Sequence, residues 1–262
     1  MNFIINDFNI FYKKYGKGKN NIIILPGWGN NRETFNYMIN FFKKDFTIYI
    51  LDYPGFGNST FPNRDLTLDD YTNLIIHFIK SKNIFNPIII AHSFGGRIAI
   101  NMEYKKEINI NKIILIDSAG IKPRKTLKQI IKQNTYKLLK KLKYILPKKY
   151  KEKYINKLIK IFGSNDFKNL NPNIRKTFIN IVNNDLKNKL NKINCATLLI
   201  WGEKDIDTPL TDAYIMNNRI KDSGLVILKY ASHFSYLEFP NYTNNIIYEF
   251  IKHDLKKETI KK

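Results

Sequence analysis

One seven-residue stretch decides the fold expected of this chain: Ile90-Ala91-His92-Ser93-Phe94-Gly95-Gly96. It places Ser93 directly after a run of isoleucines typical of a buried strand and directly before a stretch with helical spacing. A sharp turn from strand to helix tolerates only small side chains nearby, here Ala91 and Gly95, and lifts the serine oxygen above the sheet. The stretch therefore predicts a nucleophile elbow with Ser93 as nucleophile, the alternative being an ordinary glycine-rich turn.

Short apolar runs on both sides of this stretch predict an α/β fold with a mostly parallel sheet. The runs at 22–25, 88–90 and 113–116 do not alternate with polar residues, which is typical of strands buried on both faces. Amphipathic stretches between the strands would cover both faces of the sheet as helices. Eight strands are expected, at 3–5, 10–14, 22–25, 47–51, 88–91, 113–116, 197–201 and 226–230, and helices at 68–80, 97–104 and 242–251.

The alternation of strands and helices stops after the sixth strand. Residues 121–192 contain three amphipathic helical stretches and no convincing strand, so we interpret them as a lid inserted into a core formed by 1–120 and 193–262. This segment carries 21 Lys and Arg residues against three acids, whereas the rest of the chain carries 23 against 19. Nearly all of the net charge of +22 therefore belongs to the predicted lid.

The composition is that of a globular enzyme-sized chain, with 262 residues of which 44% are hydrophobic. The single cysteine, Cys195, excludes an intramolecular disulfide and zinc sites built from paired cysteines. The sequence contains neither a signal-peptide pattern at its start nor an apolar run of membrane-spanning length. We therefore expect a cytoplasmic protein that needs no metal or organic cofactor.

A second motif, Leu25-Pro26-Gly27-Trp28-Gly29-Asn30, follows the third strand and has the form of an oxyanion-hole loop. Acyl transfer needs two donors directed at a developing negative oxygen. We assign these donors to the backbone amides of Trp28 and Phe94, with Gly27 and Gly29 lining the substrate site. The alternative is a turn that only carries the chain across the sheet.

A serine hydroxyl needs a base to accept its proton, and elimination among the four histidines leaves His233. His92 adjoins the serine and should project away from its oxygen, His77 lies in an apolar helical run, and His253 lies in the charged C-terminal segment. His233 instead follows the eighth strand, at the carboxyl end of the sheet, where open α/β folds keep their sites.

The base in turn needs a carboxylate that holds its tautomer and stabilises its cation. The motif Trp201-Gly202-Glu203-Lys204-Asp205 follows the seventh strand. We prefer Asp205 to Asp207 and to Asp117, which follows the sixth strand. The chain order Ser93, Asp205, His233 is the order expected for this fold.

Five motifs in this order resemble the α/β-hydrolase superfamily: 25–29, 52–57 (DYPGFG), 91–96, 201–205 and 232–234 (SHF). The resemblance spans almost the entire chain and implies an eight-stranded α/β-hydrolase fold with a helical lid. It also implies a serine hydrolase working through an acyl-enzyme, because the similar epoxide hydrolases and haloalkane dehalogenases use an aspartate where this chain has Ser93.

The motifs do not fix the substrate. A carboxylic ester or thioester is the preferred class, with Trp28, Phe94 and Phe234 expected near an apolar acyl pocket. A carbon-carbon bond hydrolase is the alternative, in which Arg175 of the lid would bind a substrate carboxylate; the other interpretation of Arg175 is a solvated helix arginine. Few acids in the lid disfavour prolyl aminopeptidases, which bind an amine. A non-catalytic small-molecule binding protein on the same fold is the remaining alternative.

The basic lid predicts an anionic partner. It should attract an anionic substrate or make weak contact with an anionic membrane surface, an effect that salt weakens. Nucleic-acid binding is not expected, since no base-reading module accompanies the lysines. No stable protein partner is predicted.

Overall fold

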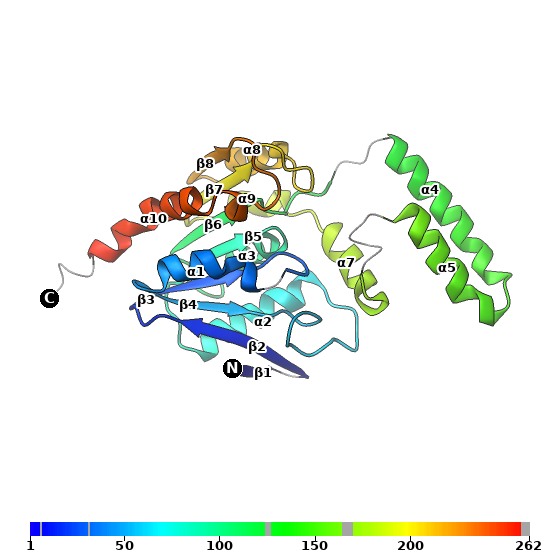
Figure 1. The fold of residues 1–262 in the computed structure, drawn as a ribbon, viewed down its shortest axis with the longest axis horizontal. Coiled ribbons are helices and arrows are strands. Elements are labelled where there is room, and N and C mark those ends of the chain that lie inside the picture. Colours follow the sequence, from blue (N-terminus) through cyan, green and yellow to red (C-terminus); the bar gives the residue numbers. More distant parts are fainter. Residues whose placement is uncertain (6, 31, 124–126, 164–169, 258–262) are drawn as a thin grey trace. The chain divides into compact units, whose positions relative to one another are not determined.

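The computed structural model describes residues 1–5, 7–30, 32–123, 127–163 and 170–257. They form an eight-stranded sheet in the order β1-β2-β4-β3-β5-β6-β7-β8 (Figure 1). β1 and β2 are antiparallel to their neighbours, and the other strands pair in parallel. The prediction of a mostly parallel eight-stranded sheet is thus confirmed. The strands are β1 (Asn2–Ile5), β2 (Phe8–Tyr15), β3 (Asn20–Leu25), β4 (Phe46–Leu51), β5 (Ile88–His92), β6 (Lys112–Ile116), β7 (Ala196–Gly202) and β8 (Ser223–Leu228).

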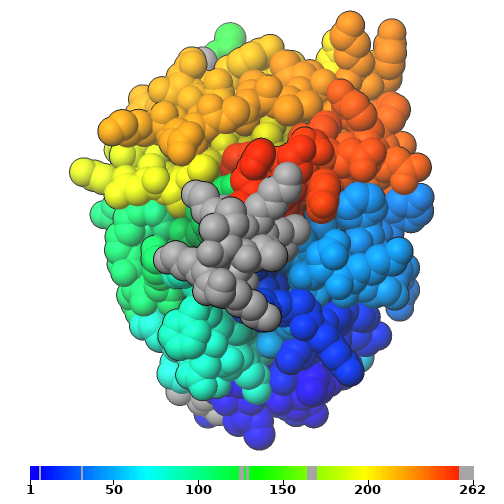
Figure 2. Space-filling view, turned by 90° about the vertical axis from the view of Figure 1, so that its left-hand side faces the viewer, coloured from blue at the N-terminus to red at the C-terminus, as the bar shows by residue number. Residues whose placement is uncertain are grey.

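Helices cover both faces of this sheet (Figure 1). α1 and α10 lie side by side on one face, where Figure 2 shows them next to each other, and α2 and α3 pack together on the other face. The helices that accompany the sheet are η1 (Arg32–Phe35), α1 (Asn36–Phe42), α2 (Leu68–Ser81), α3 (Phe94–Lys105), η4 (Lys187–Lys192), α8 (Leu210–Arg219), α9 (Ser235–Glu238) and α10 (Pro240–Lys257).

The core consists of strand side chains that alternate between the two faces. Ile22 and Ile24, Ile88 and Ile90, and Ile114 belong to one buried cluster with side chains of α1 and α10. The intervening residues of the same strands point to the opposite face, and they too are buried. Burial on both faces explains why the strands of this sheet read as continuous apolar runs.

Two details of the fold differ from the predictions. β8 extends from Ser223 to Leu228, because parallel pairing with β7 recruits a Ser-Gly pair of low strand propensity, and the backbone turns at Tyr230, which has a φ of 67°. The short helices α1 and α8 had not been predicted. Both lack a side-chain N-cap, so the usual signal for a helix start is missing.

The chain divides into two compact units, residues 1–122 with 184–262, and residues 123–183. The second unit contains α4 (Leu127–Lys141), η2 (Leu142–Tyr144), α5 (Lys148–Phe162), η3 (Pro172–Ile174) and α7 (Arg175–Val182). The predicted insertion had included 184–192. This segment groups with the first unit, where Leu186 donates a backbone hydrogen bond to Gly120 at 2.9 Å.

Parts of the insertion, 124–126 and 164–169, lie outside the described residues, and its interpretation as a lid stays a prediction. Across the described ranges, none of the helices combines the length and apolar character that crossing a membrane requires.

The close approach of α3 to β3 generates a prediction for Gly95. A Cβ at this position would lie 2.0 Å from the backbone oxygen of Leu25, whereas a Cβ at Gly224 of β8 would meet nothing within 4 Å. Gly95→Ala should therefore lower the free energy of unfolding by about 1–3 kcal/mol, and Gly224→Ala by roughly 0.5 kcal/mol or less. Urea unfolding of both variants checks this, and equal losses would contradict the packing described.

Candidate active site

The junction of β5 and α3 holds Ser93 in a strained conformation. Its φ is 50° and its ψ is −113°, outside the regions that a residue with a side chain normally occupies. Backbone hydrogen bonds support the turn: Ser93 donates to Ile116 at 3.2 Å, and its carbonyl accepts from Gly96 and Ala119, each at 3.0 Å. This geometry ends the strand and starts the helix at the serine, as a nucleophile elbow requires.

Ser93, His233 and Asp205 form a continuous chain of hydrogen bonds. The distance from Ser93 Oγ to His233 Nε2 is 3.0 Å, and that from His233 Nδ1 to Asp205 Oδ2 is 2.9 Å. A carboxylate can only accept, so Nδ1 carries the proton and Nε2 is the nitrogen that accepts from the serine hydroxyl. The three residues come from the ends of β5, β7 and β8, which all lie at the carboxyl edge of the sheet.

The carboxylate of Asp205 is held by the turn that follows β7. The Thr208 hydroxyl donates to Oδ2 at 2.6 Å, and the backbone amides of Asp207 and Thr208 donate to Oδ1, each at 2.9 Å. Burial alone would raise the pKa of Asp205, but the hydrogen bonds from His233 and Thr208 outweigh burial and lower this pKa. Asp205 therefore stays ionised and fixed in orientation.

The surroundings of His233 raise its pKa, which favours the protonated imidazole beside Asp205. Burial disfavours the imidazolium, but the hydrogen bond and the negative charge of Asp205 outweigh it, so the pKa of His233 is raised above 6.5. The neutral form needed to accept a proton thus becomes dominant only as the pH rises above this raised pKa.

Asp117, the alternative acid, supports backbone groups. Its carboxylate accepts from the backbone of Gly202 at 2.8 Å and from the backbone and hydroxyl of Ser235 at 3.1 and 2.6 Å. Burial raises the pKa of Asp117 to about 7. Asp117 therefore ties the end of β7 to the segment that follows His233, and Asp205 is the partner of the imidazole.

The loop after β3 forms a tight turn from Gly27 to Asn30. The Asn30 amide donates to the Gly27 carbonyl at 3.2 Å, and Gly29 has the left-handed φ of 72° that favours glycine. The Trp28 ring contacts the Phe94 ring edge-on at 5.2 Å between centroids. Phe94 is the first residue of α3, and the first amides of a helix have no intrahelical acceptor. The two residues predicted to form the oxyanion hole are therefore neighbours.

The structure gives the predicted substrate residues different surroundings. A Cβ at Gly27 would lie 2.6 Å from Asn30 Nδ2 and 2.8 Å from His92 Nδ1, so this glycine makes room for a polar pair. Phe234 packs against the His92 ring at 5.2 Å and against the core. Arg175 begins α7 in the second unit. A substrate role for these residues stays a prediction.

Sequence reasoning missed two polar residues next to the site, His92 and Asn30. His92 Nδ1 accepts a hydrogen bond from the Asn30 side-chain amide at 3.1 Å, and His92 Nε2 donates one to the His233 carbonyl at 2.8 Å. The contacts join positions 62 and 141 residues apart, so no local motif could have indicated them. Thr208, also missed, lies three residues after Asp205 and follows a short-range pattern typical of side-chain turns.

One cluster has the composition of a metal site, since ligand atoms of Asp205, Asp207 and His233 lie within 4.8 Å of one another. The hydrogen bonds above already use Asp205 and the Nδ1 proton of His233. The arrangement therefore fits a proton relay better than metal ligation.

The ion pair generates a prediction that needs no substrate. Asp205→Asn removes the charge that raises the pKa of His233, so this pKa should fall. Asp207→Asn should change it much less, because Asp207 is exposed and acts on this pKa less than Asp205 and Asp117 do. NMR titration of the His233 imidazole in both variants measures the two shifts. An unchanged His233 pKa in Asp205→Asn would contradict the assigned partner.

Known proteins resemble this chain in both sequence and fold. A family model described as the alpha/beta hydrolase fold matches residues 20–138. A pimeloyl-[acyl-carrier protein] methyl ester esterase of Proteus mirabilis is 23% identical over 250 residues, covering 88% of this chain and 92% of that protein. A putative esterase/lipase 2 of Mycoplasma genitalium is 29% identical over 133 residues, which are 48% of this chain and 50% of that protein.

Among solved structures, a meta-cleavage product hydrolase from Pseudomonas fluorescens IP01 superposes with a TM-score of 0.71 at 20% identity, covering 94% of this chain and 95% of that chain. The sheet order, the elbow at Ser93 and these similarities agree: the chain has the α/β-hydrolase fold and is similar to esterases in sequence and to a meta-cleavage product hydrolase in structure.

Proposed function

We propose that this hydrolase cleaves a carboxylic ester or thioester through an acyl-enzyme on Ser93. The observation that carries the proposal is the hydrogen-bond chain from Ser93 Oγ through His233 to Asp205, with distances of 3.0 and 2.9 Å. An activated nucleophile is recognised by this geometry, in which the base reaches the nucleophile and a third group orients the base.

The proposed reaction has two halves. In the first, His233 Nε2 takes the hydroxyl proton while Ser93 Oγ bonds to the acyl carbon, and the carbonyl electrons move to an oxyanion held by the amides of Trp28 and Phe94. The imidazolium then gives its proton to the departing alkoxide or thiolate. In the second half, water loses a proton to His233 and attacks the acyl carbon. The bond to Ser93 Oγ then breaks, the imidazolium returns its proton to that oxygen, and the acid leaves.

An aromatic wall beside the elbow supports an apolar acyl group. The Trp28 ring contacts Phe56, Tyr71 and Phe94 with centroids 4.9, 6.3 and 5.2 Å away. Aromatic faces of this kind bind apolar groups by excluding water. Two of the relatives named above are described as esterases, one of them a methyl ester esterase, which fits the same class of substrate.

Hydrolysis of a p-nitrophenyl ester series from acetate to laurate tests the proposal. Ser93→Ala should lose at least about 10³-fold in kcat, because the nucleophile is gone and only binding and the oxyanion donors remain. Ser81→Ala, at the exposed end of α2, is the matched control and should match the wild type. The wild-type rate should rise with pH through the raised pKa of His233.

Equal rates in the wild type and Ser93→Ala would overturn the proposal. Cleavage of a carbon-carbon bond in a vinylogous keto acid, without ester turnover, would favour the alternative chemistry. Binding of esters without any turnover would favour a binding protein.

For the second unit we infer a weak contact with an anionic membrane surface. α4 and α5 pack together: the Tyr154 hydroxyl donates to the Leu139 carbonyl at 2.8 Å, and the rings of Tyr136 and Phe162 lie 6.1 Å apart. This helical pair, residues 127–162, carries twelve lysines and one acid, Glu152. Exposed apolar side chains accompany the lysines, namely Leu127, Ile131, Leu138, Leu142 and Ile145. A basic, amphipathic pair of helices has the character of an interfacial element.

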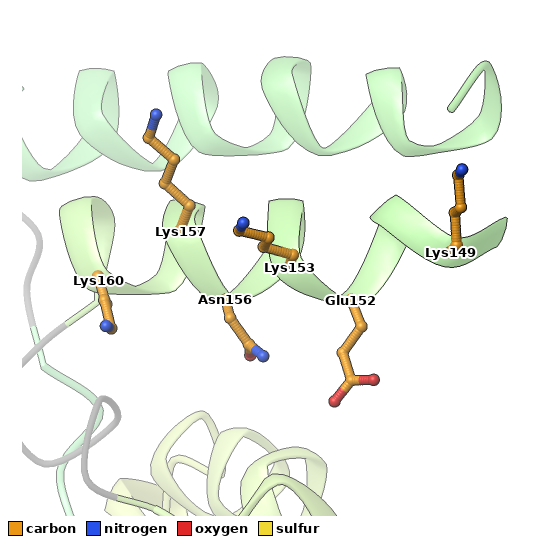
Figure 3. A pocket seen from close by; sticks show the side chains of 6 residues that line it. All are labelled: Lys149, Glu152, Lys153, Asn156, Lys157 and Lys160. Carbon is orange, nitrogen blue, oxygen red and sulfur yellow. The ribbon is translucent and has the colours of Figure 1, made fainter. Parts of the chain in front are cut away.

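Four of these lysines line one groove on α5. It has a volume of about 550 Å³ and is lined by Lys149, Glu152, Lys153, Asn156, Lys157 and Lys160 (Figure 3). Four lysines and a single carboxylate line the groove, an excess of positive charge that favours anionic groups such as lipid phosphates. The reaction proposed above does not depend on this contact.

Sedimentation with vesicles of phosphatidylcholine, with and without phosphatidylglycerol, tests the membrane contact at low and physiological salt. Replacement of Lys149, Lys153, Lys157 and Lys160 by Gln should weaken binding to anionic vesicles at least tenfold, since each lysine near the surface contributes about 1 kcal/mol. The same change at Lys43, Lys44, Lys204 and Lys221, exposed in the first unit, alters the net charge equally and should have a smaller effect. Equal binding to neutral and anionic vesicles at low salt would remove the proposal.

A further inference from the structure

The residue before the nucleophile, His92, is a completely buried histidine that the proposed reaction does not use. It is the last residue of β5 and pairs with Ile116 of β6 at the centre of the sheet. A buried polar side chain costs free energy unless its hydrogen bonds are satisfied. Its two ring nitrogens therefore show what the side chain is positioned to do.

Each ring nitrogen of His92 has a partner that can act in only one way, either as a hydrogen-bond donor or as an acceptor. Nδ1 lies 3.1 Å from the amide Nδ2 of Asn30, which can only donate, and Nε2 lies 2.8 Å from the carbonyl oxygen of His233, which can only accept. One tautomer satisfies both contacts, a neutral ring with the proton on Nε2. Burial lowers the pKa of His92 to about 3, so the neutral ring persists at ordinary pH.

One partner of His92 belongs to the predicted oxyanion-hole loop, and the other belongs to the base. Asn30 closes the turn that contains Trp28, because its backbone amide donates to the Gly27 carbonyl. His233 contributes the imidazole that lies 3.0 Å from Ser93 Oγ. His92 is covalently joined to Ser93, so the contact to the His233 carbonyl closes a ring of interactions around the nucleophile and its base.

The packing around this link leaves little freedom. A Cβ on Gly27 would lie 2.8 Å from His92 Nδ1, and the His92 ring also contacts the rings of Phe234 and Tyr236 at 5.2 and 5.0 Å. The absence of a side chain at Gly27 is what allows the Asn30–His92 contact to form. A close contact on one side and ring contacts on another fix the plane of the imidazole.

We propose that His92 is a positioning residue that fixes the oxyanion loop, through Asn30, and the base, through the His233 backbone, relative to Ser93. The inference rests on the proposed function, because positioning matters for catalysis only if Ser93 and His233 react. Misplacement of catalytic groups by about 1 Å can cost 10²-fold in rate, so a hydrogen bond to the backbone of the base can affect turnover without touching the substrate.

Two substitutions separate the two halves of the link. His92→Asn places an amide where Nδ1 lies, so it can keep the contact to Asn30 but cannot reach the His233 carbonyl. His92→Gln reaches the position of Nε2 and can still donate to that carbonyl. His77→Asn, at an exposed position of α2, is the matched control for histidine replacement.

The experiment measures kcat and KM for a p-nitrophenyl ester, the pKa of His233 by NMR, and urea unfolding for each variant. We expect His92→Asn to lose roughly 10- to 100-fold in kcat with KM within about twofold, and His92→Gln to recover most of that loss. The pKa of His233 should fall in His92→Asn, because a displaced imidazole loses part of its contact with Asp205, and should stay near the wild-type value in His92→Gln and His77→Asn.

The outcomes separate this inference from the proposed function. An unchanged His233 pKa in His92→Asn overturns the positioning role, as does a loss of kcat that only follows the loss of folded protein in urea. A wild type without ester turnover overturns the proposed function. In that case a lower His233 pKa in His92→Asn alone would still support the link between His92 and the base.

Discussion

The backbone of Ser93, held at a φ of 50° between a strand and a helix, is the constraint on which the candidate site depends. Such a conformation costs about 1–3 kcal/mol and persists only where its surroundings fix it. Here the surroundings are the backbone hydrogen bonds to Ile116, Gly96 and Ala119 and the close contact of Gly95 with the Leu25 carbonyl. The pairing of the apolar strands and the glycine next to the turn therefore hold the Ser93 hydroxyl at the carboxyl edge of the sheet.

Two buried carboxylates near this hydroxyl have different roles because their donors differ. Asp205 receives hydrogen bonds from His233 and from the Thr208 turn, which lower its pKa and keep it charged beside the imidazole. Asp117 receives hydrogen bonds from Gly202 and Ser235, and burial raises its pKa to about 7. One carboxylate thus controls the charge of the base, and the other fixes the backbone on either side of it.

Much of this arrangement could be predicted from the sequence. Continuous isoleucine runs indicated the buried parallel strands, and the small residues around Ser93 indicated the elbow, because both patterns follow from local sterics. The helices α1 and α8, which are short and begin without a side-chain cap, were missed, and β8 was misplaced because its start depends on pairing with β7. The Asn30–His92–His233 link depends on contacts across 62 and 141 positions, which no periodicity or short motif encodes.

The central claim, that Ser93 carries an acyl group during turnover, is tested most directly by trapping that group. Rapid acid quenching of the protein during hydrolysis of a p-nitrophenyl ester, followed by trypsin digestion, yields the peptide from Asn83 to Arg97, in which Ser93 is the only hydroxyl residue. We expect one acyl group on Ser93 of this peptide, formed at the rate of nitrophenol release and missing in Ser93→Ala. Steady ester turnover with this peptide unmodified throughout, or with the acyl group on another residue, would contradict it.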